Sequence, residues 1–241
     1  MEADSLFQDD DQRIEKLVMA HSRNHWDTDN RHVAGSAFII AYLTRITWPL
    51  ISLYVLERRV PDVRLDNLEF HWNGHRIDGT SIHHPSFAAR PGDPASSHPD
   101  AVTAADIAEL YARLKEWLFE SNLKIVIPSL RRAARPSLKV SWNAVAASCA
   151  QAFNRLYEVA GIPRIVVQDA AAFFGDPSSP VYRQVTMEVF NHKGKQGLFS
   201  RPAGCCLWWR TDGVNNYCSN CVLLSREQQD TEFRQNLEGR N

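Results

Sequence analysis

Residues 35–56 read GSAFIIAYLTRITWPLISLYVL, a mostly apolar stretch that is long enough to cross a lipid bilayer as a helix. Arg45 lies near its middle, and Pro49 interrupts it shortly afterwards. A charged side chain is costly at the centre of a bilayer, whereas a helix in a protein core can turn one toward its surface. We therefore predict a core helix, broken or kinked near Trp48-Pro49, and no membrane span.

Further elements are predicted on both sides of this helix. Apolar residues recur at helical spacing in residues 10–26, 107–118, 138–160 and 164–174. Thr103 is expected to cap the second of these helices, Pro128 to end it or to start a new segment, and Ser225 to cap a short final helix. Asn73-Gly74 favours a tight turn and predicts a β-hairpin. Residues 181–190 suggest a strand, and residues 83–102, with four prolines, a loop.

Together these elements predict a helix-rich α+β fold with a β-hairpin and a small cysteine-rich carboxy-terminal segment. A boundary near residue 198 would separate a body, residues 1–198, from that segment, residues 199–241. A segment of this length buries too little apolar surface to fold without either a metal or the body.

Composition excludes several classes of function. The chain has 241 residues, 44% of them hydrophobic and 23% charged, which is ordinary for a globular protein. Its 27 basic and 28 acidic residues give a formal charge of −1, so there is no general field for nucleic acid or anionic lipid. The acidic, polar start of the chain does not resemble a signal peptide, and we expect a cytoplasmic protein.

The chemistry is concentrated in the cysteines near the end of the chain. Cys205-Cys206 is followed, after eleven residues, by Cys218-Ser219-Asn220-Cys221. A C-x2-C pair can wrap two sulfurs around one metal ion. Neighbouring side chains such as Cys205 and Cys206 tend to point apart, which suits the two irons of a [2Fe–2S] cluster better than one small ion. Asp212-Gly213 and Asn215-Asn216 turn easily and would let the backbone approach such a cluster.

Three other interpretations of the four cysteines stay open at this point. Structural zinc sites are often built from four cysteines. Two disulfides would need an oxidising compartment, which nothing in the sequence suggests. The cysteines could also be unliganded core residues, although the glycine and asparagine turns beside them are not typical of a core. The fifth cysteine, Cys149, lies on the apolar face of a predicted helix and is expected to be structural.

One stretch of the sequence resembles a known family. Gly204-Cys205-Cys206-Leu207-Trp208-Trp209-Arg210, followed by Cys218-x2-Cys221, is similar to the carboxy-terminal motif of FhuF-type ferric siderophore reductases. The loop between the two pairs is one residue longer than is usual there, and Val222 stands where proline is frequent. The motif covers about residues 200–224; upstream, the similarity is limited to length, helix pattern and Ser141-Trp142-Asn143-Ala144.

The resemblance implies that Cys205, Cys206, Cys218 and Cys221 bind a [2Fe–2S] cluster. It also implies an oxidoreductase that reduces siderophore-bound Fe(III), typically on a hydroxamate siderophore, to Fe(II). Electrons would come from a ferredoxin or similar carrier. No Rossmann, Walker, G-x-S-x-G or H-E-x-x-H motif supports another enzyme class. The alternatives are a [2Fe–2S] electron carrier without a siderophore site and a zinc-stabilised binding or scaffold domain.

Residues near the ligands are weaker candidates. Arg201 and Arg210 are suited to steering an anionic carrier or polarising a chelate, but surface ion pairs would look the same in the sequence. Trp209, with Trp208 and Tyr217, is suited either to excluding water or to plain packing. His21 and His25 are spaced for one face of a helix, and we expect surface or capping roles for them because no third ligand is evident.

Overall fold

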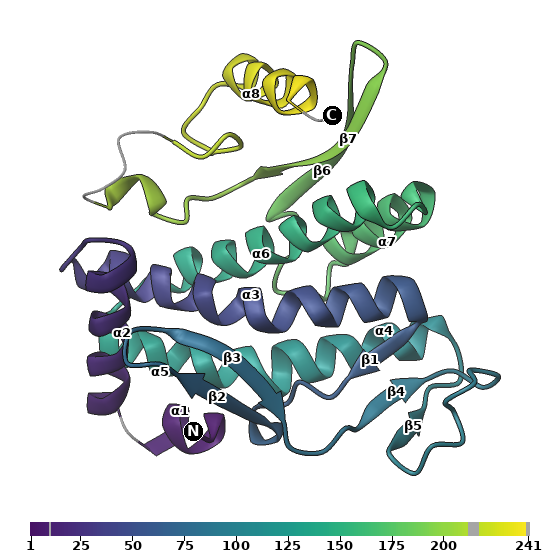
Figure 1. Ribbon diagram of the computed structural model, residues 1–241, viewed down its shortest axis with the longest axis horizontal. Helices are drawn as coiled ribbons and strands as arrows, with labels where there is room; N and C mark the ends of the chain where they lie inside the picture. Colours follow the sequence, from purple (N-terminus) through teal and green to yellow (C-terminus); the bar gives the residue numbers. More distant parts are fainter. Residues whose placement is uncertain (10, 212–216, 240–241) are drawn as a thin grey trace.

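The apolar stretch forms α3 (Arg31–Glu57), a continuous helix at the centre of the computed structural model (Figure 1). Pro49 lies inside this helix, so of the two predicted outcomes near Trp48-Pro49 the break is wrong, and the kink stays a prediction. Pro49 and Trp48 are exposed, and carbonyl groups on the solvent side of a helix can turn to water where proline removes a hydrogen bond. The length and composition of α3 would suit a membrane span, but half of its most apolar window is buried in the protein.

The structure describes residues 1–9, 11–211 and 217–239. About 56% of the chain is helical and 16% is strand, which confirms the α+β fold. The elements besides α3 are α1 (Ala3–Asp9), α2 (Asp11–His25), β1 (Arg59–Pro61), η1 (Leu65–Asn67), β2 (Leu68–Trp72), β3 (Ile77–Ile82), β4 (Phe87–Ala89), β5 (Ala101–Thr103), α4 (Ile107–Lys115), η2 (Glu116–Leu123), α5 (Lys124–Ala134), α6 (Leu138–Val159), α7 (Pro163–Gly175), β6 (Val185–His192), β7 (Lys195–Pro202), η3 (Trp208–Arg210) and α8 (Arg226–Glu238).

Helices α3 and α6 pack side by side and run in the same direction (Figure 1). Near the start of α3, Gly35 lies against Pro136, where an added Cβ would come within 2.8 Å of the proline ring. Further along, the Thr47 and Ser148 hydroxyls are 2.9 Å apart. The two helices therefore begin at the same end of the molecule. Cys149 is fully buried on α6, as predicted for a structural cysteine.

Short strands lie on the opposite side of α3 from α6 (Figure 1). Strands β2 and β3 form the hairpin predicted around Asn73-Gly74. Strands β1, β4 and β5 form a three-stranded sheet. The last two strands overlap residues 83–102, so the expectation of an unbroken loop there is wrong. Each has only three residues and is defined by backbone pairing, which leaves no alternating pattern in the sequence.

The helical run after β5 differs from the prediction in two ways. Asp106, not Thr103, caps α4, with its side chain accepting a hydrogen bond from the Glu109 N–H group. The helix then widens into the π-helical segment η2 and continues as α5 through Pro128. Pro128 lies in the second turn of α5, and the wider winding just before it offers a way to place a proline there.

The carboxy-terminal elements form a layer on α6 (Figure 1). The β6–β7 hairpin packs on α6, and α8 packs on the hairpin. Phe199, Phe233 and Leu237 form a small second core with Phe190 packed against it. Ser225 caps α8 as predicted, through a reciprocal pair of hydrogen bonds with Gln228. The boundary predicted near residue 198 lies within β7, and the division into two domains stays a prediction.

Candidate metal centre

The first cysteine pair lies over the amino-terminal parts of α3 and α6. The Ser36 hydroxyl of α3 donates a hydrogen bond of 2.6 Å to the Cys206 carbonyl oxygen. Just before the pair, Gly204 lies so close to the Asn143 carboxamide of α6 that an added Cβ would overlap it. Contacts with both helices therefore fix the backbone on each side of Cys205.

The second pair is held in a tight turn. The Cys221 N–H group donates to the Cys218 carbonyl oxygen at 2.9 Å. From α8, the Gln229 amide donates to the Cys221 carbonyl oxygen at 2.9 Å. From within the turn, the Asn220 amide donates to the Ser200 hydroxyl of β7 at 3.0 Å. This turn is thus anchored to both β7 and α8.

The two pairs meet at the Cys206 and Cys218 thiols, which lie close enough for each to shift the pKa of the other. Hydrogen bonding with Cys218 lowers the pKa of Cys206 to about 6. The same contact, together with burial, raises the pKa of Cys218 well above its ordinary value. Burial raises the pKa of Cys221, and the charges of Cys205 and Cys206 add to the effect. Thiols from both pairs are therefore electrostatic neighbours.

A preformed single-ion site is not evident among the described residues. Within residues 1–9, 11–211 and 217–239, no three His, Cys, Asp or Glu side chains converge closely enough to hold one metal ion. The turn residues Asp212-Gly213 and Asn215-Asn216 lie outside the described part of the chain. The four thiols fit an iron–sulfur centre in number and chemistry, and all four are partly exposed. The cluster itself stays a prediction.

Arg201 and Arg210 occupy different environments. The Arg201 side chain is 9% exposed, and its guanidinium forms ion pairs with Glu188, at 2.6 Å, and with Asp230. It also donates to the Gln229 side-chain oxygen at 2.6 Å, and Gln229 holds the Cys221 carbonyl. Arg201 therefore acts on the cysteine turn through α8. Arg210 is exposed and lies over the Trp209 ring, 5.9 Å from its centroid.

The aromatic residues beside the cysteines form two pairs. Trp208 packs edge-on against Trp26, which follows α2, with ring centroids 4.5 Å apart. Trp209 is 40% exposed, and its ring packs edge-on against the Tyr217 ring, with ring centroids 6.1 Å apart. The Trp26–Trp208 pair joins the stretch that carries Cys205 and Cys206, here called the cysteine-bearing segment, to the amino-terminal part of the protein. The Trp209–Tyr217 pair lies at the surface.

Several residues of this region were not predicted from the sequence. The sequence contains no pattern that marks Ser36, Gln229 or Trp26 as part of a site. A serine in an apolar helix or a glutamine in a polar helix is common in any protein. Asn143 belongs to the stretch Ser141-Trp142-Asn143-Ala144 that carried the upstream resemblance. His21 is 3% exposed, so a surface or capping role is wrong for it. Its ring packs between His25 and Phe38.

Comparison with known proteins gives a likeness of fold. No family model matches the chain, and no curated protein matches it. A solved structure of ATP-bound aerobactin synthetase IucA, from a hypervirulent pathotype of Klebsiella pneumoniae, superposes with a TM-score of 0.53 and 17% sequence identity. The alignment covers 64% of this chain and 29% of the synthetase chain. At this identity the comparison indicates a shared fold.

Proposed function

We propose that the protein is an iron–sulfur oxidoreductase that reduces siderophore-bound Fe(III), with hydroxamate siderophores as the substrate class. The observation that carries the proposal is the meeting of the two cysteine pairs at Cys206 and Cys218. Cys205, Cys206, Cys218 and Cys221 would hold a [2Fe–2S] cluster. When bound, that group would supply or accept one electron at a time.

The residues around the cysteines suit an anionic centre. The low pKa of Cys206 favours the thiolate, which is the form that binds metals. The Leu207 N–H group donates to the Cys205 sulfur at 3.2 Å, and such hydrogen bonds stabilise negative charge on sulfur. The nearby amino-terminal ends of α3 and α6 contribute partial positive charge. The Trp26–Trp208 pair covers one side of the segment and would limit the access of water.

The substrate class rests on the family resemblance of the cysteine motif. The fold adds support, because the chain shares it with part of a protein whose name, aerobactin synthetase, places it in siderophore biosynthesis. Hydroxamate oxygens are hard donors that bind Fe(III) more tightly than Fe(II). In the proposed reaction a reduced carrier protein loses one electron, Fe(III) gains it, and the chelate releases Fe(II).

Metal analysis and absorption spectroscopy test the cofactor. Protein purified without oxygen should contain about two irons and two sulfides per chain and absorb visible light. Stoichiometric zinc after expression with ample iron would favour the zinc-stabilised domain instead.

Stopped-flow mixing tests the reaction. The reduced protein should lose electrons to ferrichrome without oxygen, and an Fe(II) trap should develop colour at a rate that depends on protein concentration. Failure with every hydroxamate chelate, together with rapid oxidation by a carrier protein, would favour the electron carrier.

A further inference from the structure

Five basic side chains gather beside the carboxy-terminal half of α2, and we call them the basic cluster: His21, His25, Arg45, His75 and Arg76. His21 and His25 lie on α2, with ring centroids 5.1 Å apart. Arg45 comes from α3, and His75 and Arg76 come from the turn of the β2–β3 hairpin. The charges of Arg45 and Arg76 lower the pKa of both histidines, after the larger effect of burial. Two separate elements, α3 and the β2–β3 turn, thus bring arginine charge close to the two histidines of α2.

The basic cluster has unused hydrogen-bonding groups. Both ring nitrogens of His21, and Nε of Arg45, are buried and have no hydrogen-bond partner in the described part of the chain. One terminal nitrogen of Arg45 donates to the Ala41 carbonyl oxygen at 2.8 Å. Among the described residues, neither Arg45 nor Arg76 forms an ion pair with a carboxylate. Asp78 is the acidic group whose charge acts on Arg45. Buried nitrogens without a partner, such as those of His21 and Nε of Arg45, are costly unless a hydrogen-bonding group joins them, and beside two arginines an anion suits that role best.

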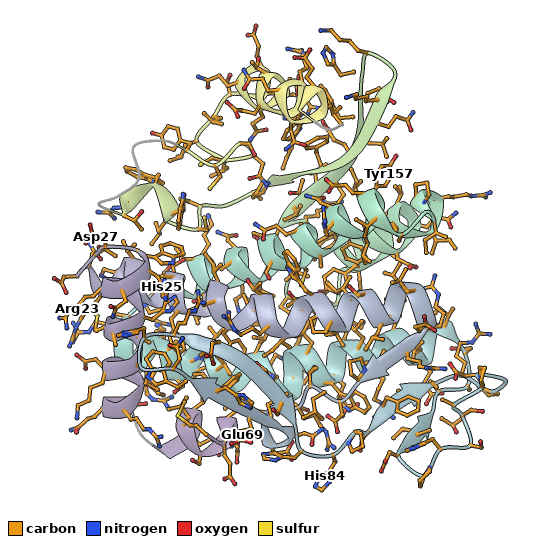
Figure 2. All side chains as sticks on the ribbon, in the orientation of Figure 1. Arg23, His25, Asp27, Glu69, His84 and Tyr157 are labelled. Carbon is orange, nitrogen blue, oxygen red and sulfur yellow. The ribbon has the colours of Figure 1, made fainter. Side chains whose placement is uncertain are left out.

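The basic cluster also lies close to the candidate metal centre. His25 is followed directly by Trp26, whose ring contacts Trp208 on the cysteine-bearing segment. Figure 2 shows His25 at the end of α2 nearest to that segment. A molecule held by the basic cluster would therefore lie next to the aromatic pair that borders the cysteines.

We propose that the basic cluster binds negatively charged groups, such as carboxylates, on an iron chelate, so that anionic ferric chelates are the preferred substrates. This inference rests on the proposed reductase function and narrows its substrate class. Arg45 and His21 would form the deeper part of the site, and His25, His75 and Arg76 its exposed rim. In this proposal the exposed rim makes the first contact with a small acidic group, and rearrangement of its side chains would let that group bind the buried nitrogens. The surface of an acidic carrier protein is too large to do so and would meet only the rim.

Ferrioxamine B offers matched chelates for the test, because its free amine lies away from the iron. The parent chelate is a cation, the N-acetyl derivative is neutral and the N-succinyl derivative carries a carboxylate. Quenching of tryptophan fluorescence measures the dissociation constant of each chelate with the full-length protein. We expect the succinyl derivative to bind about tenfold more tightly than the parent, and the difference to shrink as salt is added.

Variants then locate the preference. Arg45→Gln and Arg76→Gln should each weaken binding of the succinyl derivative about threefold to tenfold and leave the acetyl derivative unchanged. Arg45→Lys, which keeps the charge, should retain much of the preference. Arg23→Gln is the matched control, because Arg23 is an exposed arginine of α2 that is paired with Asp29 outside the basic cluster. Arg76 is exposed on a hairpin turn, so its replacement is expected to fold even if Arg45→Gln does not.

The outcomes separate the two proposals. Equal binding of all three chelates, or a preference that survives both arginine replacements, would overturn the anion site even in a protein that holds iron and reduces chelates. Variants that slowed only the electron transfer from a carrier protein would overturn it as well. Absence of iron and sulfide would instead overturn the reductase proposal, and binding of the three chelates would still report on the basic cluster.

Discussion

Cys206 and Cys218 lie at the point where the two halves of the cysteine motif touch, so their replacement tests the ligand assignment directly. Cys206→Ser and Cys218→Ser should each bleach the visible absorption or make it labile, because a ligand thiolate is lost. Iron and sulfide content, measured after anaerobic purification, should fall in parallel with the absorption.

Cys149 provides the matched control, since it is fully buried on α6, where burial raises its pKa far above the ordinary value. Cys149→Ala should cost about 1 kcal/mol of unfolding free energy and leave the spectrum intact. Loss of the spectrum in this variant, with retention in Cys206→Ser, would contradict the assignment of ligands.

Gly204 is a second residue with a sharp expectation. In Gly204→Ala, the new methyl group would overlap the buried Asn143 carboxamide, so the cysteine-bearing segment or Asn143 has to move. We expect a loss of about 1–3 kcal/mol in unfolding free energy and faster release of iron to a chelator. Denaturant titration measures the first effect and absorbance the second.

Two further variants test the cause of that loss. Asn143→Ala should partly rescue Gly204→Ala in the double variant, because it removes the atoms that the methyl group meets. Gly175→Ala is the matched control: apart from its own helix and chain neighbours, no atom of the described residues lies within 4 Å of its added Cβ. An equal loss in both glycine variants would show that close packing at Gly204 is not the cause.

The buried His21 side chain should make the free energy of unfolding depend on pH. Burial, aided by the charges of His25, Arg45 and Arg76, lowers the pKa of His21 to about 4. The unfolded chain therefore binds a proton at this residue at higher pH than the folded chain does. The contribution of His21 is complete above its unfolded pKa, about 6.5, and is lost as the pH falls toward 4.

The loss from His21 should amount to about 2–3 kcal/mol of unfolding free energy between pH 6.5 and pH 4. Urea denaturation at several pH values would measure it as a difference between the wild-type protein and His21→Phe, which has no titrating group. Parallel curves for the two proteins would mean that His21 titrates normally in the folded state.

Among the helices and strands, the sequence predicted the elements that have a strong local signal in their residues. Asn73-Gly74 marked the β2–β3 hairpin, and Ser225, followed by Gln228, marked the start of α8. Strand β7 gave no clear signal, because its burial runs through four consecutive residues, Leu198 and Phe199 among them, instead of alternating. Strand β4 exists through pairing with β1, and β5 through pairing with β4, and a local sequence pattern cannot contain information about such partners.

In the candidate site, too, residues with a local pattern were predicted and residues that act through tertiary contacts were not. Cys205, Cys206, Cys218 and Cys221 were identified because their spacing carries chemical meaning. Ser36, which lies 170 positions before Cys206, supports the site through tertiary contact alone. Pro49 and Pro128 show the reverse case, in which a strong local signal for a break is overridden by packing of the surrounding helix.

The amino-terminal cap of α8 should affect the cysteine turn, because Gln229 on this helix holds the Cys221 carbonyl. Ser225→Ala removes the capping hydrogen bond to the Gln228 N–H group and should cost about 1 kcal/mol of unfolding free energy. Iron should also be lost to a chelator more quickly. Thiol labelling of the metal-free protein would report the looser turn through faster modification of Cys221.

Thr231→Ala, in the same helix, is the control for Ser225→Ala. The Thr231 hydroxyl donates to the Glu227 carbonyl oxygen within the helix, and alanine is a better helix former there. This variant should be as stable as the wild type and hold iron as well. Faster iron loss in Thr231→Ala, to the same extent, would argue against a specific role of the cap.

Two apolar clusters of unequal size support the candidate site from opposite sides. The large core runs through α3, α5 and α6. The cysteine-bearing segment lies against α3 and α6. The small core, Phe199, Phe233 and Leu237, joins α8 to β7 on the other side. Between them, the cysteine-bearing segment is held by single hydrogen bonds and the Trp26–Trp208 contact. A bound metal centre would therefore contribute most of its stabilisation to this segment.

Removal of the metal should consequently loosen one part of the protein and spare the other. Hydrogen–deuterium exchange, compared between the metal-loaded and metal-free forms, should increase in residues 203–211 and 217–239 and stay unchanged in α3 and α6. The increase should be largest around Cys218 and Cys221, whose turn depends on the small core and on Gln229. Equal increases throughout the chain would mean that the metal stabilises a single cooperative unit, and no increase would mean that the cysteine-bearing segment is held by its protein contacts alone.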